Sequence, residues 1–335
     1  MQLALGPGYL PAVLSCLPAV LAGLVLVHGI ARPVAPRGEE RRFVRTRART
    51  RGSRTLRLMQ QSSATDARRS RALVTGAASG IGRQVAIDLH RQGWRLELID
   101  RDEAGLRRLL AGLDAAGDRV VAHVVDVAVA AEVEQLEARL ASGPLDLLVN
   151  SAGVLHLGPF ERMPPAELER VLGVNLIGAA LVTRALLPRL LEGTRPCVVQ
   201  VGSAAGLVGA PGMAAYSASK FGLLGLAEAL RGELRGRVHV CTVCPTFVRT
   251  NIVASASVAG APERGEAERA LAQLGASPGK VARAILEGAR RRRRLVLVNP
   301  GAHALHLLHR LSPALTEVVV ARGYRWLQRR GVLAR

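Results

Sequence analysis

The sequence predicts an α/β fold: a Rossmann-type doubly wound parallel sheet of about seven strands, with helices on both faces. Short apolar runs alternate with segments of helical periodicity, which is typical of parallel strands joined by crossover helices. The apolar runs are nearly continuous, as expected for strands that are buried on both faces. At 335 residues, the chain is long enough to bury one substantial core.

The expected strands lie at intervals along residues 71–300, which form the predicted α/β domain. We place them near residues 72–75, 95–99, 120–125, 145–149, 196–201, 238–243 and 295–298. Residues 251–278 break the pattern, because Gly, Ala, Ser and Pro interrupt it. Loops of this length are usually functional or disordered, and an ordinary long loop is the alternative.

A glycine-rich turn joins the first strand to the first helix. Its residues are Thr75, Gly76, Ala77, Ala78, Ser79, Gly80, Ile81 and Gly82. A strand, a glycine turn and a helix in this order direct backbone N–H groups and a helix N-terminus at a pyrophosphate. Glycine keeps side chains clear of the phosphates, although a purely structural turn is the alternative.

Tyr216 and Lys220 lie four residues apart where helical periodicity begins, so they are expected to share one face of a helix. A nearby ammonium group favours the tyrosinate and lowers the tyrosine pKa from about 10, which suits a proton donor in carbonyl reduction. The chain has two lysines and 44 arginines. Arginine does not readily share protons with a tyrosine, so Lys220 argues against a chance pair.

Together these motifs resemble the short-chain dehydrogenase/reductase family. The glycine turn has the family's Thr-Gly-x-x-x-Gly-x-Gly form, and Ser203 precedes the Tyr216-x-x-x-Lys220 pair by thirteen residues. Further matches follow the family's order, and the resemblance covers roughly residues 70–300. It implies hydride transfer between a nicotinamide cofactor and an alcohol, a ketone or an aldehyde.

The resemblance also implies four catalytic residues. Tyr216 would be the acid/base, and Lys220 would lower its pKa and position the ribose. Ser203 follows the apolar run 198–201 and would bind the substrate oxygen, stabilising its developing charge. Asn175 would support a water relay to the lysine. Residues 251–278 fall where the family places its mobile, substrate-covering helices.

The cofactor-binding residues implied by the same resemblance extend along most of the domain. They are Gly76, Ser79, Gly80, Ile81, Gly82, Asp100, Arg101, Asp126, Val127, Asn150, Ala152, Gly153, Tyr216, Lys220, Val248 and Thr250. Two positions depart from the family's pattern: Ser151 replaces an asparagine and Thr246 replaces a glycine. No metal site is expected.

The cofactor is predicted to be NAD or NADP, with NAD favoured. Asp100 ends the second expected strand, where a carboxylate would bind the ribose hydroxyls of NAD and repel a 2′-phosphate. Arg101 follows it, and an arginine at that family position favours NADP. Ser79 occupies the position where many NADP-preferring relatives place a basic residue. A solvated charge at a helix start is the alternative for Arg101.

Charge is concentrated at the two ends of the chain. Residues 32–71 carry thirteen arginines and three acids, and residues 280–335 carry thirteen basic residues and two acids. The middle, 72–279, has twenty basic and twenty-one acidic residues. Nucleic-acid binding by the basic ends is disfavoured, because the first of them offers only Phe43 for base stacking.

The N-terminal 1–70 combines a hydrophobic segment with an arginine-rich linker. Residues 9–31 contain no charged side chain and are long enough to span a bilayer. The arginines that follow would hold the catalytic domain on the cytoplasmic side. An over-extended start, with Met59 as the true first residue, and a disordered segment remain open.

The C-terminal extension, residues 301–335, is basic and amphipathic. Its composition suits a membrane interface, and it equally suits a helix packed on a partner, since a homo-oligomer is expected. The four cysteines, Cys16, Cys197, Cys241 and Cys244, are expected to be small buried hydrophobic residues.

The predicted function is an NAD(P)-dependent oxidoreductase in the cytoplasm, with membrane anchoring open. Its small-molecule alcohol or carbonyl substrate is expected to be lipophilic, given the apolar 251–275 segment. The alternative is a sensor or scaffold that binds the nicotinamide cofactor without turnover. The intact Ser203, Tyr216 and Lys220 set argues against that alternative.

Overall fold

The computed structural model describes residues 70–113, 119–250, 252, 257–258 and 275–329. They belong to one compact unit, Asp66–Arg335. The predicted anchor 9–31, the arginine-rich linker, Cys16 and most of the 251–278 segment lie outside the described residues.

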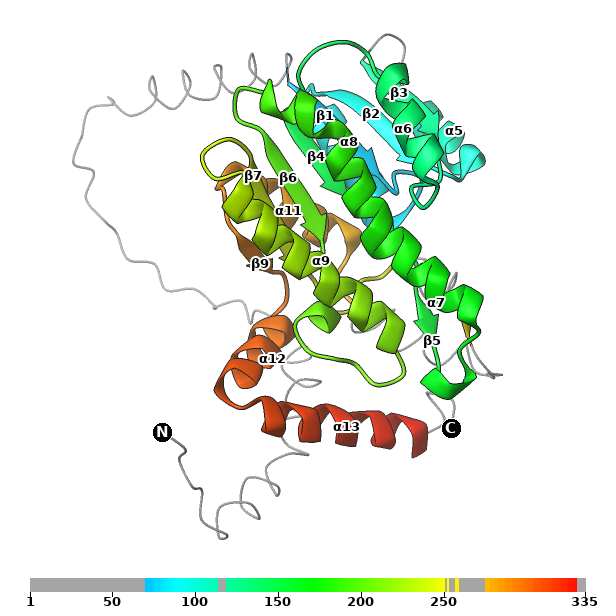
Figure 1. Cartoon of the computed structure of the whole chain (residues 1–335), viewed down its shortest axis with the longest axis vertical. Helices are drawn as coiled ribbons and strands as arrows, with labels where there is room; N and C mark the ends of the chain where they lie inside the picture. Colours follow the sequence, from blue (N-terminus) through cyan, green and yellow to red (C-terminus); the bar gives the residue numbers. More distant parts are fainter. Residues whose placement is uncertain (1–69, 114–118, 251, 253–256, 259–274, 330–335) are drawn as a thin grey trace, which may run out of the picture. The chain divides into compact units, whose positions relative to one another are not determined.

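A seven-stranded parallel sheet forms the centre of this unit, in the order β3-β2-β1-β4-β6-β7-β9 (Figure 1). Its strands are β1 (Arg71–Thr75), β2 (Arg95–Asp100), β3 (Val120–Val124), β4 (Leu147–Asn150), β6 (Cys197–Val201), β7 (His239–Cys244) and β9 (Leu295–Leu297). The order reverses after β3, beside β1, so β1 and β4 flank the point where ligands bind in doubly wound sheets. The predicted fold is therefore confirmed.

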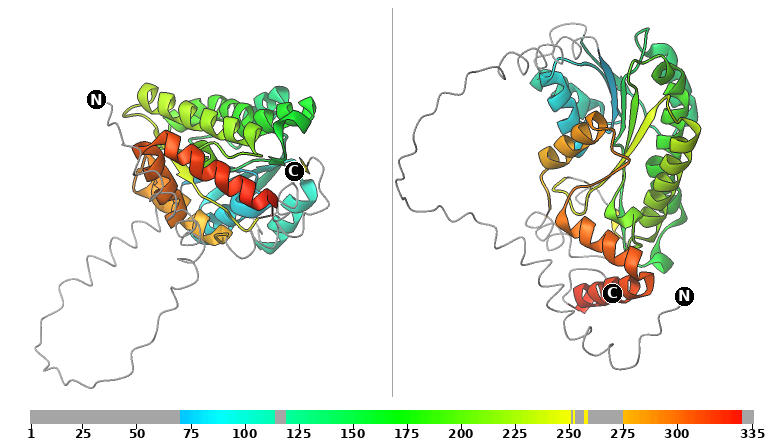
Figure 2. Two further views of the ribbon diagram at one scale, coloured as in Figure 1. Left: turned by 90° about the horizontal axis from the view of Figure 1, so that it is seen from below. Right: turned by 90° about the vertical axis from the view of Figure 1, so that its left-hand side faces the viewer.

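Helices cover both faces of the sheet, as the edge-on view of Figure 2 shows. On one face lie α4 (Gly80–Arg91), α5 (Glu103–Gly112) and α11 (Pro278–Arg290). On the other lie α6 (Ala130–Arg139), α8 (Ala179–Leu191) and α9 (Ala214–Glu233). Since successive side chains of a strand point to opposite faces, Leu73 and Val74 enter different core clusters.

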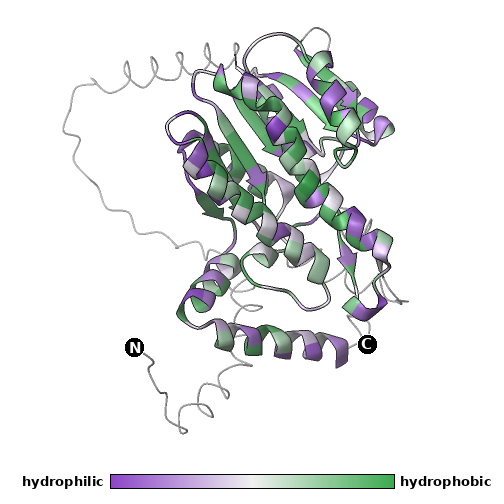
Figure 3. Cartoon of the chain, in the orientation of Figure 1, coloured by the Kyte–Doolittle hydropathy of each residue, from purple (hydrophilic) through white to green (hydrophobic). Residues whose placement is uncertain are grey.

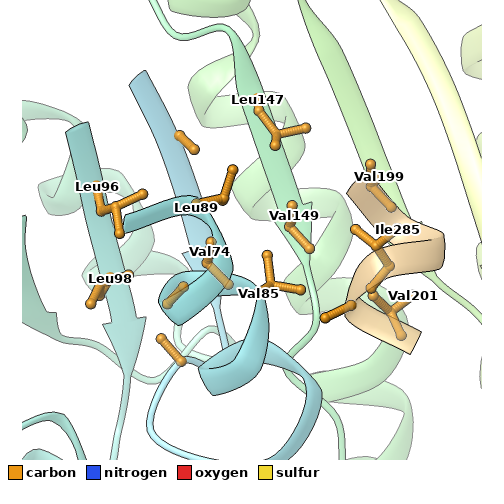
Figure 4. Close-up of a cluster of buried hydrophobic side chains, with 14 of the residues drawn as sticks. Val74, Val85, Leu89, Leu96, Leu98, Leu147, Val149, Val199, Val201 and Ile285 are labelled. Carbon is orange, nitrogen blue, oxygen red and sulfur yellow. The ribbon is translucent and has the colours of Figure 1, made fainter. Parts of the chain in front are cut away.

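The core lies between these helices and the strands. Figure 4 shows Val85 and Leu89 of α4 beside Val74 and Val149, and Ile285 of α11 beside Val199 and Val201. The strands are the most uniformly hydrophobic part of the chain in Figure 3, as expected for a sheet covered on both faces. Burial of this apolar surface is the main force that stabilises the sheet.

A long, interrupted helix precedes β6. It consists of α7 (Pro165–Leu172), the π-helical turn η2 (Gly173–Gly178) and α8. Among the described residues, only this helix, Pro165–Leu191, is long and apolar enough to cross a membrane. Val182, Leu186 and Leu190 of α8 are buried against the sheet, which explains its apolar composition without a bilayer.

Several short elements were not predicted. β5 (His156–Leu157) pairs in parallel with β8 (Ser257–Val258), and 3-10 turns occur at η1 (Phe160–Arg162) and η3 (Ala204–Gly206). Strands of two residues have no hydrophobic period to detect. The chain continues into α12 (Pro300–Leu311) and α13 (Pro313–Arg329), which contact one another.

The three described cysteines are buried and free, as predicted. Burial raises the pKa of Cys241 to about 12 and that of Cys244 to about 12, so both remain neutral thiols. Within the described ranges, no group of three or more His, Cys, Asp or Glu residues is arranged to hold a metal ion.

Candidate active site

A cleft of about 300 Å³ opens at the carboxyl ends of β1, β2 and β4. Eleven of the predicted cofactor-binding residues line it: Gly76, Ser79, Gly80, Ile81, Asp100, Arg101, Asp126, Val127, Ala152, Gly153 and Thr250. The parallel sheet brings these distant segments together, because all its strands end at the same edge.

The N-terminus of α4 forms one wall of the cleft. Ser79 is the N-cap of α4 but makes no side-chain cap, and the first turn has no acidic residue. The first N–H groups of a helix have no intrahelical partner, so this end is suited to an anion.

The glycines of the turn allow close backbone approach. A Cβ on Gly76, whose φ is +67°, would lie 2.8 Å from the backbone of Ala152. A Cβ on Gly82 would lie 2.2 Å from the carbonyl oxygen of Gly76. Gly82 does not line the cleft; it allows α4 to pack on the turn. Both glycines are needed, as predicted, but for different reasons: Gly76 allows the turn to approach Ala152, and Gly82 allows α4 to pack on the turn.

Thr75, which was not among the predicted cofactor-binding residues, joins two walls of the cleft. Its Oγ1 accepts hydrogen bonds from the backbone N–H groups of Ser151 and Ala152, each at 3.1 Å. The bonds join the turn after β1 to the turn after β4. Thr75 therefore contributes to the shape of the cleft, although the sequence analysis placed it only in the first strand and the glycine-rich turn and gave it no role in the site.

Acidic residues occupy the wall formed after β2 and β3. Asp100 accepts hydrogen bonds from the N–H groups of Ala78 at 2.9 Å and Asp102 at 3.0 Å. Arg101 lies beside Asp126, with 3.5 Å between Nη1 and Oδ2. Arg101 therefore sits in the cleft, but its guanidinium is held at a second carboxylate.

Two other predicted cofactor-binding residues lie away from the cleft. The Asn150 amide is buried, and its Nδ2 donates to Thr183 Oγ1 at 2.9 Å on α8. Val248 pairs with Ala276 in an isolated bridge and packs against the core cluster under α4. The resemblance identified the segments correctly, but it could not show the direction in which each side chain points.

Six further residues line the cleft without having been predicted: Asp102, Val125, Ser151, Val154, Val174 and Ile252. Most of them are adjacent in sequence to predicted residues, so their position in the same segments was the signal that could have identified them. Asp102 resembles an ordinary helix N-cap, and its Oδ1 does accept the Gly105 N–H at 2.9 Å.

The four predicted catalytic residues lie together at one end of this cleft. Tyr216 and Lys220 are one turn apart on α9, with Nζ 5.7 Å from the centre of the tyrosine ring. The side chains of Tyr216 and Ser203 share a hydrogen bond. Gly153 connects the group to the cleft, since a Cβ there would lie 3.8 Å from Lys220 Nζ.

Asn175 is a buried positioning residue within the π-helical turn. Its Nδ2 donates to Ser219 Oγ at 3.1 Å and to the Val154 carbonyl at 3.0 Å, while its Oδ1 accepts the Val154 N–H at 2.8 Å. Ser219 Oγ in turn donates to the Tyr216 carbonyl at 2.7 Å. Asn175 thus links the wall of the cleft to the helix that carries Tyr216 and Lys220.

The electrostatics of the tyrosine differ from the sequence expectation. Burial raises the pKa of Tyr216 above its usual value, and the hydrogen bond from Ser203 acts in the opposite direction. Burial also lowers the pKa of Lys220 to about 8. The lysine donates to the Val201 carbonyl at 2.9 Å. The predicted depression of the Tyr216 pKa was wrong for this arrangement, because desolvation outweighs the other influences on the phenol.

The lowered pKa of Lys220 predicts a pH-dependent stability. The pKa is about 8 in the folded chain, against 10.5 for an unperturbed lysine. Between these values the unfolded chain binds more protons, so stability rises with pH. In the protein without cofactor, the free energy of unfolding of the wild type should increase relative to Lys220→Met by roughly 2 kcal/mol from pH 8 to pH 10.

Urea unfolding of both proteins across this range measures the difference. The series stops at pH 10 because the raised pKa of Tyr216 would reverse the slope above the unfolded tyrosine pKa. A difference between wild type and variant that does not change with pH would contradict the lowered lysine pKa.

The site fits a nicotinamide dinucleotide. The uncapped α4 terminus and the glycine turn suit a pyrophosphate, and the carboxylates at the β2 end suit ribose hydroxyls. Lys220 and the Tyr216–Ser203 pair lie at the other end, where a reactive ring would meet a substrate. This arrangement defines a nucleotide-dependent oxidoreductase site.

Comparison with known proteins agrees with this geometry. A model of the family described as short chain dehydrogenase matches residues 70–259. The chain belongs to the short-chain dehydrogenase/reductase family, whose members act as dehydrogenases or reductases on alcohol and carbonyl groups. "Probable oxidoreductase EphD" of Mycobacterium tuberculosis is 35% identical over 72% of this chain, a match that spans 43% of EphD.

Solved structures share the fold. A short-chain dehydrogenase/reductase from Burkholderia phymatum in complex with NAD is 31% identical, with a TM-score of 0.67, and the match covers 73% of this chain and 94% of that one. A Sphingobium yanoikuyae enzyme in complex with NADPH is 28% identical, with a TM-score of 0.61, covering 74% and 94%. Related structures therefore bind either cofactor.

Proposed function

We propose that this protein interconverts an alcohol and a ketone or aldehyde, that its substrate is lipophilic, and that NAD is its preferred cofactor. The hydrogen-bonded Tyr216–Ser203 pair, one helical turn from buried Lys220, is the observation that carries the proposal. A cofactor bound in the cleft supplies or accepts the hydride. The substrate oxygen then lies at the Tyr216 hydroxyl, within reach of Ser203.

The chain's own residues supply the proton transfer. The raised pKa of Tyr216 keeps the phenol protonated, ready to donate to an oxygen on which negative charge develops. Ser203 donates a second hydrogen bond to that oxygen and stabilises the charge. Lys220 is charged below pH about 8 and favours the tyrosinate left after transfer. Asn175 keeps α9 in register with the cleft.

The preference for NAD rests on the charges at the ribose end. Asp100 places a carboxylate in the cleft, and the Asp126 carboxylate, 3.5 Å from the exposed Arg101 guanidinium, offsets part of the attraction of Arg101 for a phosphate. A 2′-phosphate would lie near two carboxylates.

Asp100→Ala should raise the dissociation constant of NAD more than that of NADP, because it removes a hydroxyl acceptor and a phosphate-repelling charge. Arg101→Ala should weaken NADP more than NAD. The ratio of the two dissociation constants is the measurement, since loosening of the Ala78 turn affects both cofactors alike. Unchanged ratios in both variants would mean that neither residue reads the 2′ position.

The alternative is a cofactor-binding sensor or scaffold without turnover. A panel of alcohols and ketones, presented with each cofactor and followed by absorbance of the reduced nicotinamide, separates the two. Turnover of any lipophilic alcohol or ketone in the panel supports the proposal that the protein is an enzyme. Tight cofactor binding without turnover across the panel favours the sensor.

The cellular placement is a separate proposal. The uncharged residues 9–31, followed by arginines, support a membrane anchor with the catalytic domain in the cytoplasm. Full-length protein should then sediment with membranes and resist high salt, since apolar insertion is not screened. Recovery of the whole chain in the soluble fraction would rule the anchor out. A homo-oligomer remains expected, to be tested by its mass in solution.

A further inference from the structure

The helices α12 and α13 lie across the carboxyl end of the sheet, next to the segment that leads into α9 (Figure 2). Their inner faces join a core cluster in which Leu305 and Val320 pack against Leu207 and Val208. Tyr324 of α13 lies against the turn before Tyr216: a Cβ on Gly212 would be 2.8 Å from its ring. The two helices are thus an integral part of the domain beside the catalytic residues.

Their outer faces combine exposed apolar side chains with arginines. On α12, Leu307 is 59% exposed and Leu311, one turn later, is 75% exposed. On α13, Val318 is 41% exposed and Trp326 is 52% exposed, on the face that also carries the exposed arginines. Those arginines are Arg322, Arg325 and Arg329 on α13, with Arg310 on α12.

The same surface continues beyond α13. Phe160 of η1 is 59% exposed, and its neighbour Glu161 raises the pKa of Tyr324 electrostatically, as a secondary cause after burial. The η1 turn therefore lies near α13. Apolar side chains from three elements are exposed at this end of the domain, and in the described part of the chain none of the four arginines pairs with an acid.

We infer that this surface, made by α12, α13 and η1, contacts a membrane leaflet that contains anionic lipids. Leucine and phenylalanine side chains suit the acyl boundary, and a half-exposed tryptophan suits the headgroup level. Arginines beside them extend their charged ends to lipid phosphates while their stems cover apolar surface. This contact is independent of residues 9–31.

A second copy of the chain fits the surface less well. A two-fold contact through α12 and α13 would bring the same four arginines of each copy together, with only Glu317 as an exposed acid on the two helices. Like charges close together at an interface are unfavourable. An anionic leaflet provides the opposite charge to all four arginines, which outnumber the exposed acids of this surface, Glu317 of α13 and Glu161 of η1.

The test uses the full-length chain and its two tryptophans, Trp94 and Trp326. Trp94 is partly buried against the core under α4, away from α13. In Trp94→Phe, Trp326 is the only emitter. Vesicles of phosphatidylcholine with phosphatidylglycerol should shift its emission to the blue, and acyl-brominated lipids should quench it. If Trp94→Phe does not fold, the wild type is used instead. The brominated lipids should then quench only the part of its emission that comes from Trp326.

A matched pair of variants tests the arginines. Replacing Arg322, Arg325 and Arg329 by Gln should weaken the equilibrium for contact of Trp326 with anionic lipid, read from its own blue shift and quenching, by roughly fivefold for each arginine removed. Trp326 reports this local contact even where residues 9–31 hold the chain at the vesicle. Replacing Arg292, Arg293 and Arg294, which are exposed after α11, removes the same charge and should leave the response unchanged.

Three results would overturn the inference. One is emission of Trp326 that neither shifts with phosphatidylcholine–phosphatidylglycerol vesicles nor is quenched by acyl-brominated lipids. Another is an equal loss in both triple variants, which would indicate a general charge effect. The third is a blue shift that grows with protein concentration without vesicles, which would identify a second copy as the occupant.

Discussion

Tyr216→Phe should lower kcat by roughly a hundredfold to ten-thousandfold, the contribution that a positioned acid/base group makes. The phenol is the group that meets the substrate oxygen, and its hydrogen bond to Ser203 holds it in place. Phenylalanine keeps the ring on α9 and the packing around it. The affinity for cofactor should therefore change little, because the cleft is lined by other residues.

Steady-state turnover and the cofactor dissociation constant, measured on one substrate from the panel, decide this prediction. Tyr324→Phe is the matched control, since it removes the same hydroxyl from a tyrosine on α13 and should leave kcat unchanged. A Tyr216→Phe enzyme that turns over within about threefold of wild type would exclude this residue as the proton donor.

Among alanine substitutions in the glycine-rich turn, we expect Gly82→Ala to cause the largest loss of stability and cofactor affinity. The new Cβ would lie 2.2 Å from the Gly76 carbonyl oxygen and 3.0 Å from that of Thr75, both backbone atoms that cannot swing aside. Helix α4 must move away from the turn, which we expect to cost roughly 1–3 kcal/mol of stability. Because the displaced terminus is the proposed pyrophosphate site, cofactor affinity should also fall by about tenfold or more.

Gly225→Ala provides the contrasting control. Gly225 lies inside α9 with no atom within 4 Å of an added Cβ, and its φ is not positive. Alanine there should stabilise the protein by about 0.5–1 kcal/mol, because glycine is the poorer helix residue. Thermal unfolding of both variants, with and without cofactor, measures the effects. Equal behaviour of the two variants would refute the close packing of α4 on the turn.

The spacing of residues in the sequence predicted which residues lie close together in the site. It did not predict the directions of their side chains or their pKa values. The distance from Tyr216 to Lys220 in sequence is a helical turn, so their proximity followed from local geometry. The glycine turn likewise predicted the N-terminus of α4. The direction of the Asn150 side chain, which is buried with Thr183 behind the sheet, depended on packing against α8. The pKa of Tyr216 depended on burial by segments far along the chain.

By itself, the sequence determined the order and type of the main elements, because hydrophobic periodicity and turn chemistry act over a few residues. It also determined which segments supply the site. Only the tertiary structure decided that Thr75 joins two turns, that Asn175 is bound to Ser219, and that α13 lies against Gly212. These contacts join residues 44 to 112 positions apart in the chain. Long-range packing and the desolvation that it causes are properties of the assembled domain, and no local pattern records them.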